Sequence, residues 1–230
     1  MKTTRDVVRE TLAKVATSLG ADLESVLFVG GTVAALYDGQ LDIRPTEDVD
    51  CAVRTSLPEY HAFLARLKSR GFKECTEPGA PICRLMTDTG ALLGVMPIDE
   101  GILGFSNRWY AEAFQEAQTF ALGERLRVRA LSPIYFVATK LEAFRSRGRS
   151  DYRTSHDLED VLSLLGQRPA LIDEIERGTT PVCRALQGEL RGLAASEDFL
   201  DAIPGCFIGS PEAQRLADEL TKRFLAMRAA

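Results

Sequence analysis

The sequence LFVGGTVAALYDGQLDIRPTEDVDCAV, residues 27–53, contains two aspartates within a segment that otherwise predicts a buried β-strand. In a strand, successive side chains point to opposite faces of the sheet. Val49 and Cys51 would therefore share one face of this strand. Asp48 and Asp50 would share the other face, so we expect the strand to present two neighbouring carboxylates side by side.

Two ionised carboxylates on one face repel each other, and a divalent cation that binds between them removes this repulsion. Mg²⁺ in proteins typically binds through one or two carboxylates together with substrate phosphates. A pair of aspartates in a strand is also typical of a solvated edge strand. The spacing of Asp48 and Asp50 alone therefore leaves both interpretations open.

A glycine-rich turn, Gly30-Gly31-Thr32, lies upstream of the two aspartates and opens a small-residue helical pattern. Glycines let the backbone approach a phosphate closely, and the start of a helix offers free N–H groups. Such a turn before a helix is more often only a tight bend. Its combination with the aspartates favours a nucleoside triphosphate site, with Thr46 on the polar approach to the strand.

The residues around this stretch predict an α/β or α+β domain with a mixed sheet. Apolar residues at helical spacing from Val8 to Leu19 predict an amphipathic helix that stops at Gly20. Further predicted elements are a strand at 26–29, a helix at 32–38, a helix around 60–67 that ends at Gly71, β-like runs at 82–86 and 91–96, and a hairpin at 119–131 that turns at Gly123-Glu124.

From Ser132 onward the pattern becomes helical. Pro133 suits a first helical position, and Ser155 can cap a second helix that would end at Gly166. Further helices are expected at residues 169–178, 181–195 and 211–228. We therefore expect a core domain over 1–130 and a helical C-terminal region over 131–230.

Composition excludes several classes of protein. No apolar run approaches the length of a membrane span, so a cytoplasmic protein without membrane contact is expected. Five cysteines without CxxC spacing and two histidines predict reduced thiols rather than a zinc site or disulfides. A net charge of −5 argues against nonspecific coating of nucleic acid. A local basic cluster exists nevertheless, formed by Lys140, Arg145, Arg147, Arg149 and Arg153.

The stretch at 30–53 resembles the signature of the minimal nucleotidyltransferases related to DNA polymerase β, a Gly-Gly-Ser/Thr turn followed by an Asp-x-Asp strand. More closely, the chain resembles the AbiEii/AbiGii-toxin-type nucleotidyltransferases. That resemblance includes VMPIDEGILGFSNRWY and LSPIYFVATKLEAFRSRGRSDYRTSHDLEDVLSLL, and so covers roughly residues 25–165. It implies a nucleotidyltransferase-like mixed sheet flanked by helices, with the helical C-terminal region completing the nucleotide cleft.

The resemblance also implies roles for particular residues. Gly30, Gly31 and Thr32 would bind the triphosphate, while Asp48 and Asp50 would hold Mg²⁺ or Mn²⁺. The family motif places Lys140 against the nucleotide phosphates and the acid Asp157 near the same cleft. A lysine at the border of an apolar helix face, as Lys140 is, can equally be a snorkelling side chain. Asp160, one turn beyond Asp157, could support that acid or simply face water, and we favour the second interpretation.

The chain departs from the family at one position. Relatives usually carry a third acid in a stretch like Val-Asp-Val-Met-Pro, whereas this chain has LLGVMPID, with Gly94 at that position. The third acid commonly helps to position the metal and to deprotonate the attacking hydroxyl. Asp99 and Asp88 are candidates to replace it, although neither position follows from strand geometry.

The resemblance and the residues together predict a Mg²⁺-dependent nucleotidyltransferase that transfers a nucleoside monophosphate from an NTP to an acceptor. The acceptor could be RNA, especially tRNA, because an arginine-rich segment suits a phosphate backbone. A protein or an antibiotic acceptor stays open. The family also suggests the toxin of a toxin–antitoxin pair, with an antitoxin as partner. The alternative is a noncatalytic, NTP-binding regulatory module that has lost the third carboxylate.

Overall fold

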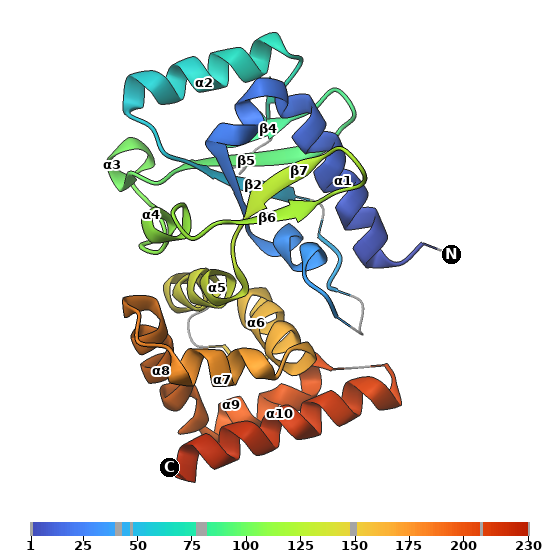
Figure 1. Ribbon diagram of the computed structural model, residues 1–230, viewed down its shortest axis with the longest axis vertical. Helices are drawn as coiled ribbons and strands as arrows, with labels where there is room; N and C mark the ends of the chain where they lie inside the picture. Colours follow the sequence, from blue (N-terminus) through green and yellow to red (C-terminus); the bar gives the residue numbers. More distant parts are fainter. Residues whose placement is uncertain are drawn as a thin grey trace. The chain divides into compact units, whose positions relative to one another are not determined.

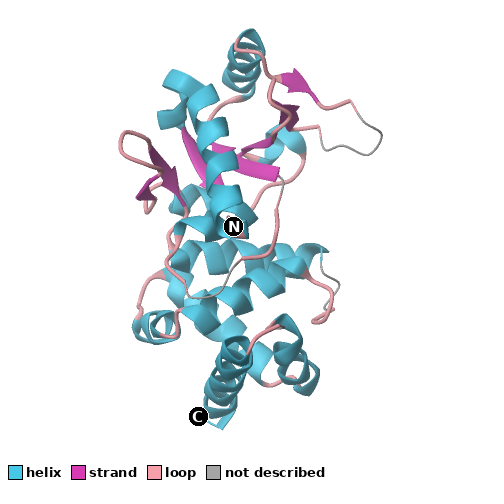
Figure 2. Cartoon of the chain, turned by 90° about the vertical axis from the view of Figure 1, so that its right-hand side faces the viewer, coloured by secondary structure: helices cyan, strands magenta, loops and turns pink. Residues whose placement is uncertain are grey.

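A computed structural model describes residues 2–39, 43–46, 48–76, 82–147, 151–207 and 209–229. The chain divides into two compact units: unit 1 is residues 1–37 with 44–132, and unit 2 is residues 38–43 with 133–230. In the described residues, all strands belong to unit 1 and unit 2 is helical, as the colours of Figure 2 show. The expected mixed α/β class with a helical C-terminal region is confirmed. None of the described helices is both long and apolar enough to cross a membrane.

The described part of unit 1 forms a mixed sheet of seven strands in the spatial order β3-β4-β5-β2-β1-β7-β6. Figure 1 labels β2, β4, β5, β6 and β7 of this sheet. Neighbouring strands are antiparallel except that β2 runs parallel to β5 and β1 runs parallel to β7. The strands are β1 (Val26–Val29), β2 (Asp48–Val53), β3 (Lys73–Glu74), β4 (Arg84–Met86), β5 (Leu92–Pro97), β6 (Gln118–Ala121) and β7 (Arg127–Ala130).

The two strands that matter most for the site, β1 and β2, lie next to each other in the middle of this sheet. All four residues of β1 are buried, which explains its unbroken apolar sequence VLFV. In β2 the residues Val49 and Cys51 are fully buried, whereas Asp48 and Asp50 are partly exposed. Both strands have the predicted bounds, and the predicted alternation of faces in β2 is confirmed.

Helices flank the sheet in unit 1. In α1 (Thr4–Leu19) the apolar residues from Val8 to Leu19 that predicted this helix are buried, and Gly20 follows with a φ of 54°. In α2 (Leu57–Ser69) the hydroxyl of Tyr60 donates to the backbone oxygen of Val95 on β5 at 2.8 Å. The shorter helices of this unit are η1 (Gly20–Ser25), η2 (Gly31–Leu36), α3 (Glu100–Leu103) and α4 (Tyr110–Ala113).

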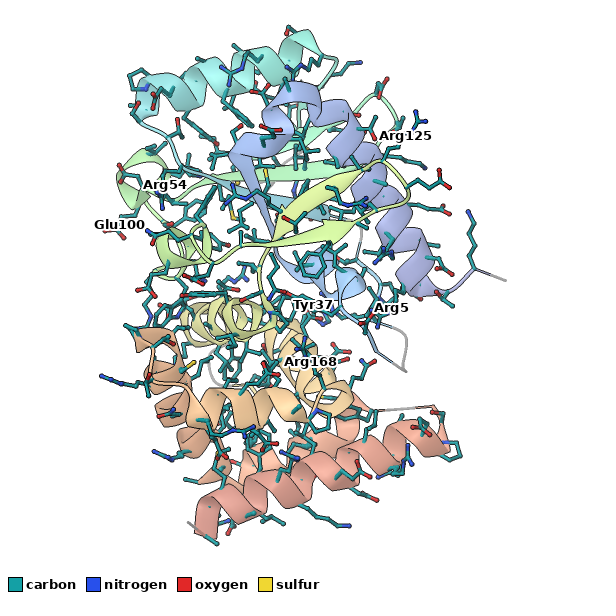
Figure 3. The ribbon with its side chains drawn as sticks, viewed as in Figure 1. Arg5, Tyr37, Arg54, Glu100, Arg125 and Arg168 are labelled. Carbon is teal, nitrogen blue, oxygen red and sulfur yellow. The ribbon has the colours of Figure 1, made fainter. Side chains whose placement is uncertain are left out.

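The helix expected at 32–38 is a 3₁₀ helix, η2, rather than an α-helix. Two arginines of α1 bind its last backbone oxygens: Arg5 donates to Ala34 at 3.0 Å and to Tyr37 at 2.5 Å, and Arg9 donates to Ala35 at 3.1 Å. Arg5 and Tyr37 lie side by side in Figure 3. The arginines of α1 thus satisfy backbone oxygens at and just beyond the end of this short helix.

Unit 2 consists of α5 (Pro133–Arg147), α6 (His156–Gln167), α7 (Ala170–Arg177), α8 (Pro181–Ala194), α9 (Glu197–Ala202), η3 (Ile203–Cys206) and α10 (Pro211–Ala229). The start of α5 at Pro133 and the cap of α6 by Ser155 are confirmed. The expected end of α6 at Gly166 was wrong, because the helix continues to Gln167. A side chain at position 166 would meet the ring of Phe207 at 2.6 Å, so this glycine serves helix packing.

Candidate functional site

Asp50 lies at the centre of the candidate site in unit 1. Its neighbours in the sheet are Val29 on β1 and Gly94 on β5. A Cβ atom placed on Gly94 would lie 2.3 Å from one carboxylate oxygen of Asp50, and one placed on Gly30 would lie 2.5 Å from the other. Gly30 also has a φ of 74°, which favours glycine. The Asp50 carboxylate therefore occupies a space that is open because Gly30 and Gly94 lack side chains. We call this space the seat of Asp50.

Asp48 forms an ion pair that the sequence did not predict. The Arg84 guanidinium donates from Nη2 to Oδ2 of Asp48, and the side chains are 29% and 32% exposed. Arg84 belongs to β4 and pairs in register with Gly94, which in turn pairs with Asp50. Residues paired in register point to the same face of a sheet, so Arg84 stands on the face that carries the aspartates.

Gly94, where the sequence resemblance led us to expect a third acid, pairs in register with Asp50. Neither candidate replacement stands in this row of residues: Asp99 lies beyond the end of β5, where it accepts a hydrogen bond from the backbone of Gly101 at 2.9 Å, and Asp88 is exposed in the turn after β4. Among the described residues, no group of three or more His, Cys, Asp and Glu side chains could hold a metal ion. The site therefore offers two carboxylates.

Two carboxylates fit Mg²⁺ only when the nucleotide completes the coordination, which is the usual arrangement for this ion. The seat of Asp50 holds its carboxylate on the exposed face of β2, and Asp48 already has a cation, Arg84, as partner. The two carboxylates are oxygen donors of the kind that Mg²⁺ prefers, so they fit this metal together with phosphate oxygens, although Arg84 already compensates one of the two charges.

The glycine-rich turn is accessible only in part. Gly30 and Gly31 are partly exposed, whereas Thr32 is fully buried and its hydroxyl has no hydrogen-bond partner among the described residues. The two glycines can meet a ligand, but Thr32 lies beneath the turn rather than on its surface. Thr46, predicted on the approach to β2, is partly exposed.

The face of β2 opposite the aspartates is apolar and uncharged. Burial raises the pKa of the Cys51 thiol far above its usual value, and the nearby charge of Asp50 raises it further. Burial likewise raises the pKa of the Cys83 thiol. Both cysteines are free thiols, as expected. The aspartates therefore stand on a strand whose other face is neutral core.

The predicted residues of unit 2 form a cluster of their own. The ammonium group of Lys140 on α5 binds Asp157 at 3.0 Å and Asp160 at 2.7 Å, both on α6. Lys140 is 8% exposed and Asp160 is 7% exposed. The expectation that Asp160 faces water was wrong, because its carboxylate is needed to neutralise a buried lysine. Lys140 does not snorkel to solvent, since its charge is satisfied inside the unit.

Two arginines of the predicted basic cluster also have acidic partners in unit 2. Arg145 binds Glu189 at 2.5 Å, and Arg147 binds the second oxygen of Asp157 at 3.0 Å. Arg153 is exposed, and Arg149 lies outside the described residues. The cluster therefore carries less uncompensated positive charge than the sequence suggested.

No model of a known protein family matches this sequence, and no curated protein matches it. Two of the solved structures that it resembles come from Helicobacter pylori. One is JHP933 from Helicobacter pylori, with 14% identity and a TM-score of 0.45 over 96% of this chain and 95% of that chain. The other, an H. pylori protein described provisionally as a nucleotidyltransferase, has 15% identity and a TM-score of 0.47 over 96% of this chain and 97% of that chain. At these values the likeness assigns no function to this chain.

Proposed function

We propose that this protein is a nucleotidyltransferase that transfers a nucleoside monophosphate from an NTP to a hydroxyl or phosphate acceptor. The acceptor oxygen would bond to the α-phosphorus, and the bond to the β-phosphate would break to release pyrophosphate. One observation carries the proposal: Asp48 and Asp50 stand on one face of a central strand, with the Asp50 carboxylate seated against the Gly30 turn.

Each part of this site has a role in the proposal. Asp48 and Asp50 would hold Mg²⁺, which when bound neutralises phosphate charge and polarises the phosphorus centre. The exposed backbone of Gly30 and Gly31 would bind phosphate oxygens at close range. On the strength of the family resemblance, Lys140 stays in the proposal as a nucleotide-binding and catalytic residue and Asp157 stays as a catalytic acid.

RNA is the proposed acceptor, with Arg153 and the other arginines of the basic cluster as its predicted binding residues. The closer resemblance to AbiEii/AbiGii-type toxins adds the hypothesis of a cognate antitoxin. The RNA acceptor and the antitoxin are proposed binding partners. Either proposal can be wrong without contradicting the transfer reaction.

The test is incubation with Mg²⁺, each α-labelled NTP in turn, and total RNA. Wild type should label RNA, and Asp50→Asn should reduce labelling by about 100-fold or more, because a carboxylate ligand of the metal is lost. The control is Asp201→Asn, an exposed aspartate of α9 that has no proposed role. Equal labelling by wild type and Asp50→Asn would contradict the proposal.

A second candidate function is supported by Gly94 and Arg84. A site with a glycine at the third acid position, and with an arginine on one of the two remaining carboxylates, suits a module that binds NTP without catalysis. Calorimetry with Mg²⁺ and each NTP distinguishes the two functions. Binding without any labelled product, whether RNA, protein or small molecule is offered, favours the binding module.

A further inference from the structure

Arg84, Gly94 and Asp50 form one row across three adjacent strands, β4, β5 and β2. Arg84 nevertheless binds Asp48 rather than Asp50. Strands lie about 4.8 Å apart, so the guanidinium must pass over β5 to reach a strand that is not a neighbour of its own. The missing side chain at Gly94 leaves this path open. The departure from the family pattern at position 94 and the Arg84 ion pair are therefore structurally linked.

The ion pair changes what Asp48 can bind. Oδ2 of Asp48 receives the Arg84 guanidinium, so a divalent cation at that oxygen would meet an adjacent positive charge. The guanidinium therefore makes the local charge around Asp48 one unit less negative than it would be without the arginine. Because Arg84 and Asp48 are both about one-third exposed, solvent weakens this effect without removing it.

The same guanidinium suits phosphate. Arginine presents a planar fork of donors that binds phosphate oxygens as well as it binds a carboxylate. Arg84 stands on the face of the sheet that carries both aspartates, so phosphates placed beside Asp48 and Asp50 come within its reach. A polyphosphate can therefore take the guanidinium away from Asp48 and free that carboxylate.

We propose that Arg84 is an internal counter-cation that excludes a divalent cation from Asp48 until phosphates bind the guanidinium. Metal and nucleotide then enter the site together, and a free metal ion binds weakly. The identity of the phosphate ligand as a nucleotide rests on the proposed function. The competition between Arg84 and the metal for Asp48 does not.

The first experiment measures Mn²⁺ binding to the nucleotide-free protein by electron paramagnetic resonance. Arg84→Gln should bind Mn²⁺ about threefold to tenfold more tightly than wild type, because the competing charge is gone. Adding Asp48→Asn to Arg84→Gln should abolish this gain. The matched control is Arg66→Gln, which removes an arginine that binds Asp22 at 2.9 Å elsewhere in unit 1, and it should leave Mn²⁺ affinity unchanged.

The second experiment measures binding of inorganic tripolyphosphate without metal, by calorimetry. Asp48→Asn frees the guanidinium and should tighten tripolyphosphate binding about threefold to tenfold, whereas Arg84→Gln should weaken it. Either of two results overturns the proposal: Mn²⁺ affinity of Arg84→Gln no higher than that of Arg66→Gln, or unchanged tripolyphosphate affinity in Asp48→Asn. If Arg84→Gln does not fold, the Asp48→Asn measurement decides alone. Both binding measurements can be interpreted even if the protein transfers no nucleotide.

Discussion

Asp50 depends on residues that are distant from it in the sequence. Gly30 and Gly94 border its two carboxylate oxygens, and each would collide with them if it carried a Cβ atom. The carboxylate can take its observed position only because these two places hold no side chain. At the scale of single residues, the site is therefore defined as much by two absent side chains as by the aspartates.

Gly94→Ala should disturb this seat directly. The new Cβ would lie 2.3 Å from Oδ1 of Asp50, so the carboxylate must turn away. We expect the affinity for Mg²⁺-nucleotide to fall by about tenfold or more, as is typical when a group that orients a metal ligand is changed. Stability should fall by only about 1–2 kcal/mol, because the displaced atoms belong to a flexible side chain. Calorimetry and thermal unfolding measure the two effects.

Unchanged nucleotide affinity in Gly94→Ala would mean that Asp50 binds equally well outside its seat. The same geometry affects attempts to restore the third acid. In Gly94→Asp the new Cβ atom would displace the Asp50 carboxylate from its position. The new carboxylate would also compete with Asp48 for the Arg84 guanidinium. A gain in transfer from Gly94→Asp alone is therefore not expected.

The aspartate pair could be predicted because side-chain alternation is a local property of a strand. Arg84 could not, because its role depends on the register of β4 against β5 and of β5 against β2. The only local signal was the alternation in the stretch RLM, where Leu85 is buried and Arg84 must point the other way. Nothing in that stretch shows which strand lies beside it.

At the scale of elements, α5 and α6 are joined by Lys140 and its two acids. Lys140→Ala would remove the cation that Asp157 and Asp160 share in a largely buried setting, although Arg147 would stay on Asp157. We expect a loss of about 3 kcal/mol in unfolding free energy. Arg223→Ala is the matched control, since Arg223 binds Asp173 at 2.9 Å with both side chains more than one-third exposed. It should cost less than about 1 kcal/mol.

Urea unfolding measures both variants. A loss in Lys140→Ala as small as that in Arg223→Ala would show that the cluster contributes little to the packing of α5 on α6. Asp160→Asn in the Lys140→Ala background should recover part of the stability, because it removes the buried carboxylate charge that Lys140 had neutralised. Any effect of Lys140→Ala on nucleotide binding has to be measured where the variant remains folded.

The sequence does not show whether a glycine inside a helix makes room for a neighbouring side chain or faces open space. Gly166 lies within α6 against the Phe207 ring, whereas a Cβ on Gly192 of α8 would meet nothing within 4 Å. Gly166→Ala should therefore destabilise the protein by about 1–3 kcal/mol through overpacking. Gly192→Ala should stabilise it by about 0.5–1 kcal/mol through helix propensity. Thermal unfolding of the two variants gives shifts of opposite sign, and shifts of the same sign would contradict this assignment.

The helices and strands with strong periodicity were predictable. The apolar spacing from Val8 to Leu19 and the run VLFV predict buried elements without any knowledge of what packs against them. The end of α6 was not, because a glycine can terminate a helix or admit a neighbouring ring, and only packing distinguishes these roles. The helices α9 and η3 were missed, because they are shorter than the periodic pattern needs.

At the scale of the whole molecule, each unit contains a buried cysteine. The rate at which this thiol is alkylated measures how often its unit opens. Cys51 on β2 is fully buried in unit 1, and Cys183 on α8 is 4% exposed in unit 2. Burial raises the pKa of Cys51, so its thiol reacts with an alkylating agent only after unit 1 opens. Rates of alkylation at the two positions, measured by mass spectrometry, therefore follow the two units separately.

Mg²⁺-nucleotide at 100 times its Kd should stabilise the unit that binds it by about 2.7 kcal/mol and slow its alkylation by about 100-fold. We expect this protection at Cys51, because the aspartates share its strand. The proposal that Lys140 and Asp157 act on the bound nucleotide requires protection at Cys183. Slowing at Cys51 without any slowing at Cys183 would remove these two residues from the site and leave unit 1 as the nucleotide-binding part. Slowing at neither position, with nucleotide binding absent by calorimetry, would contradict a nucleotide site on β2 itself.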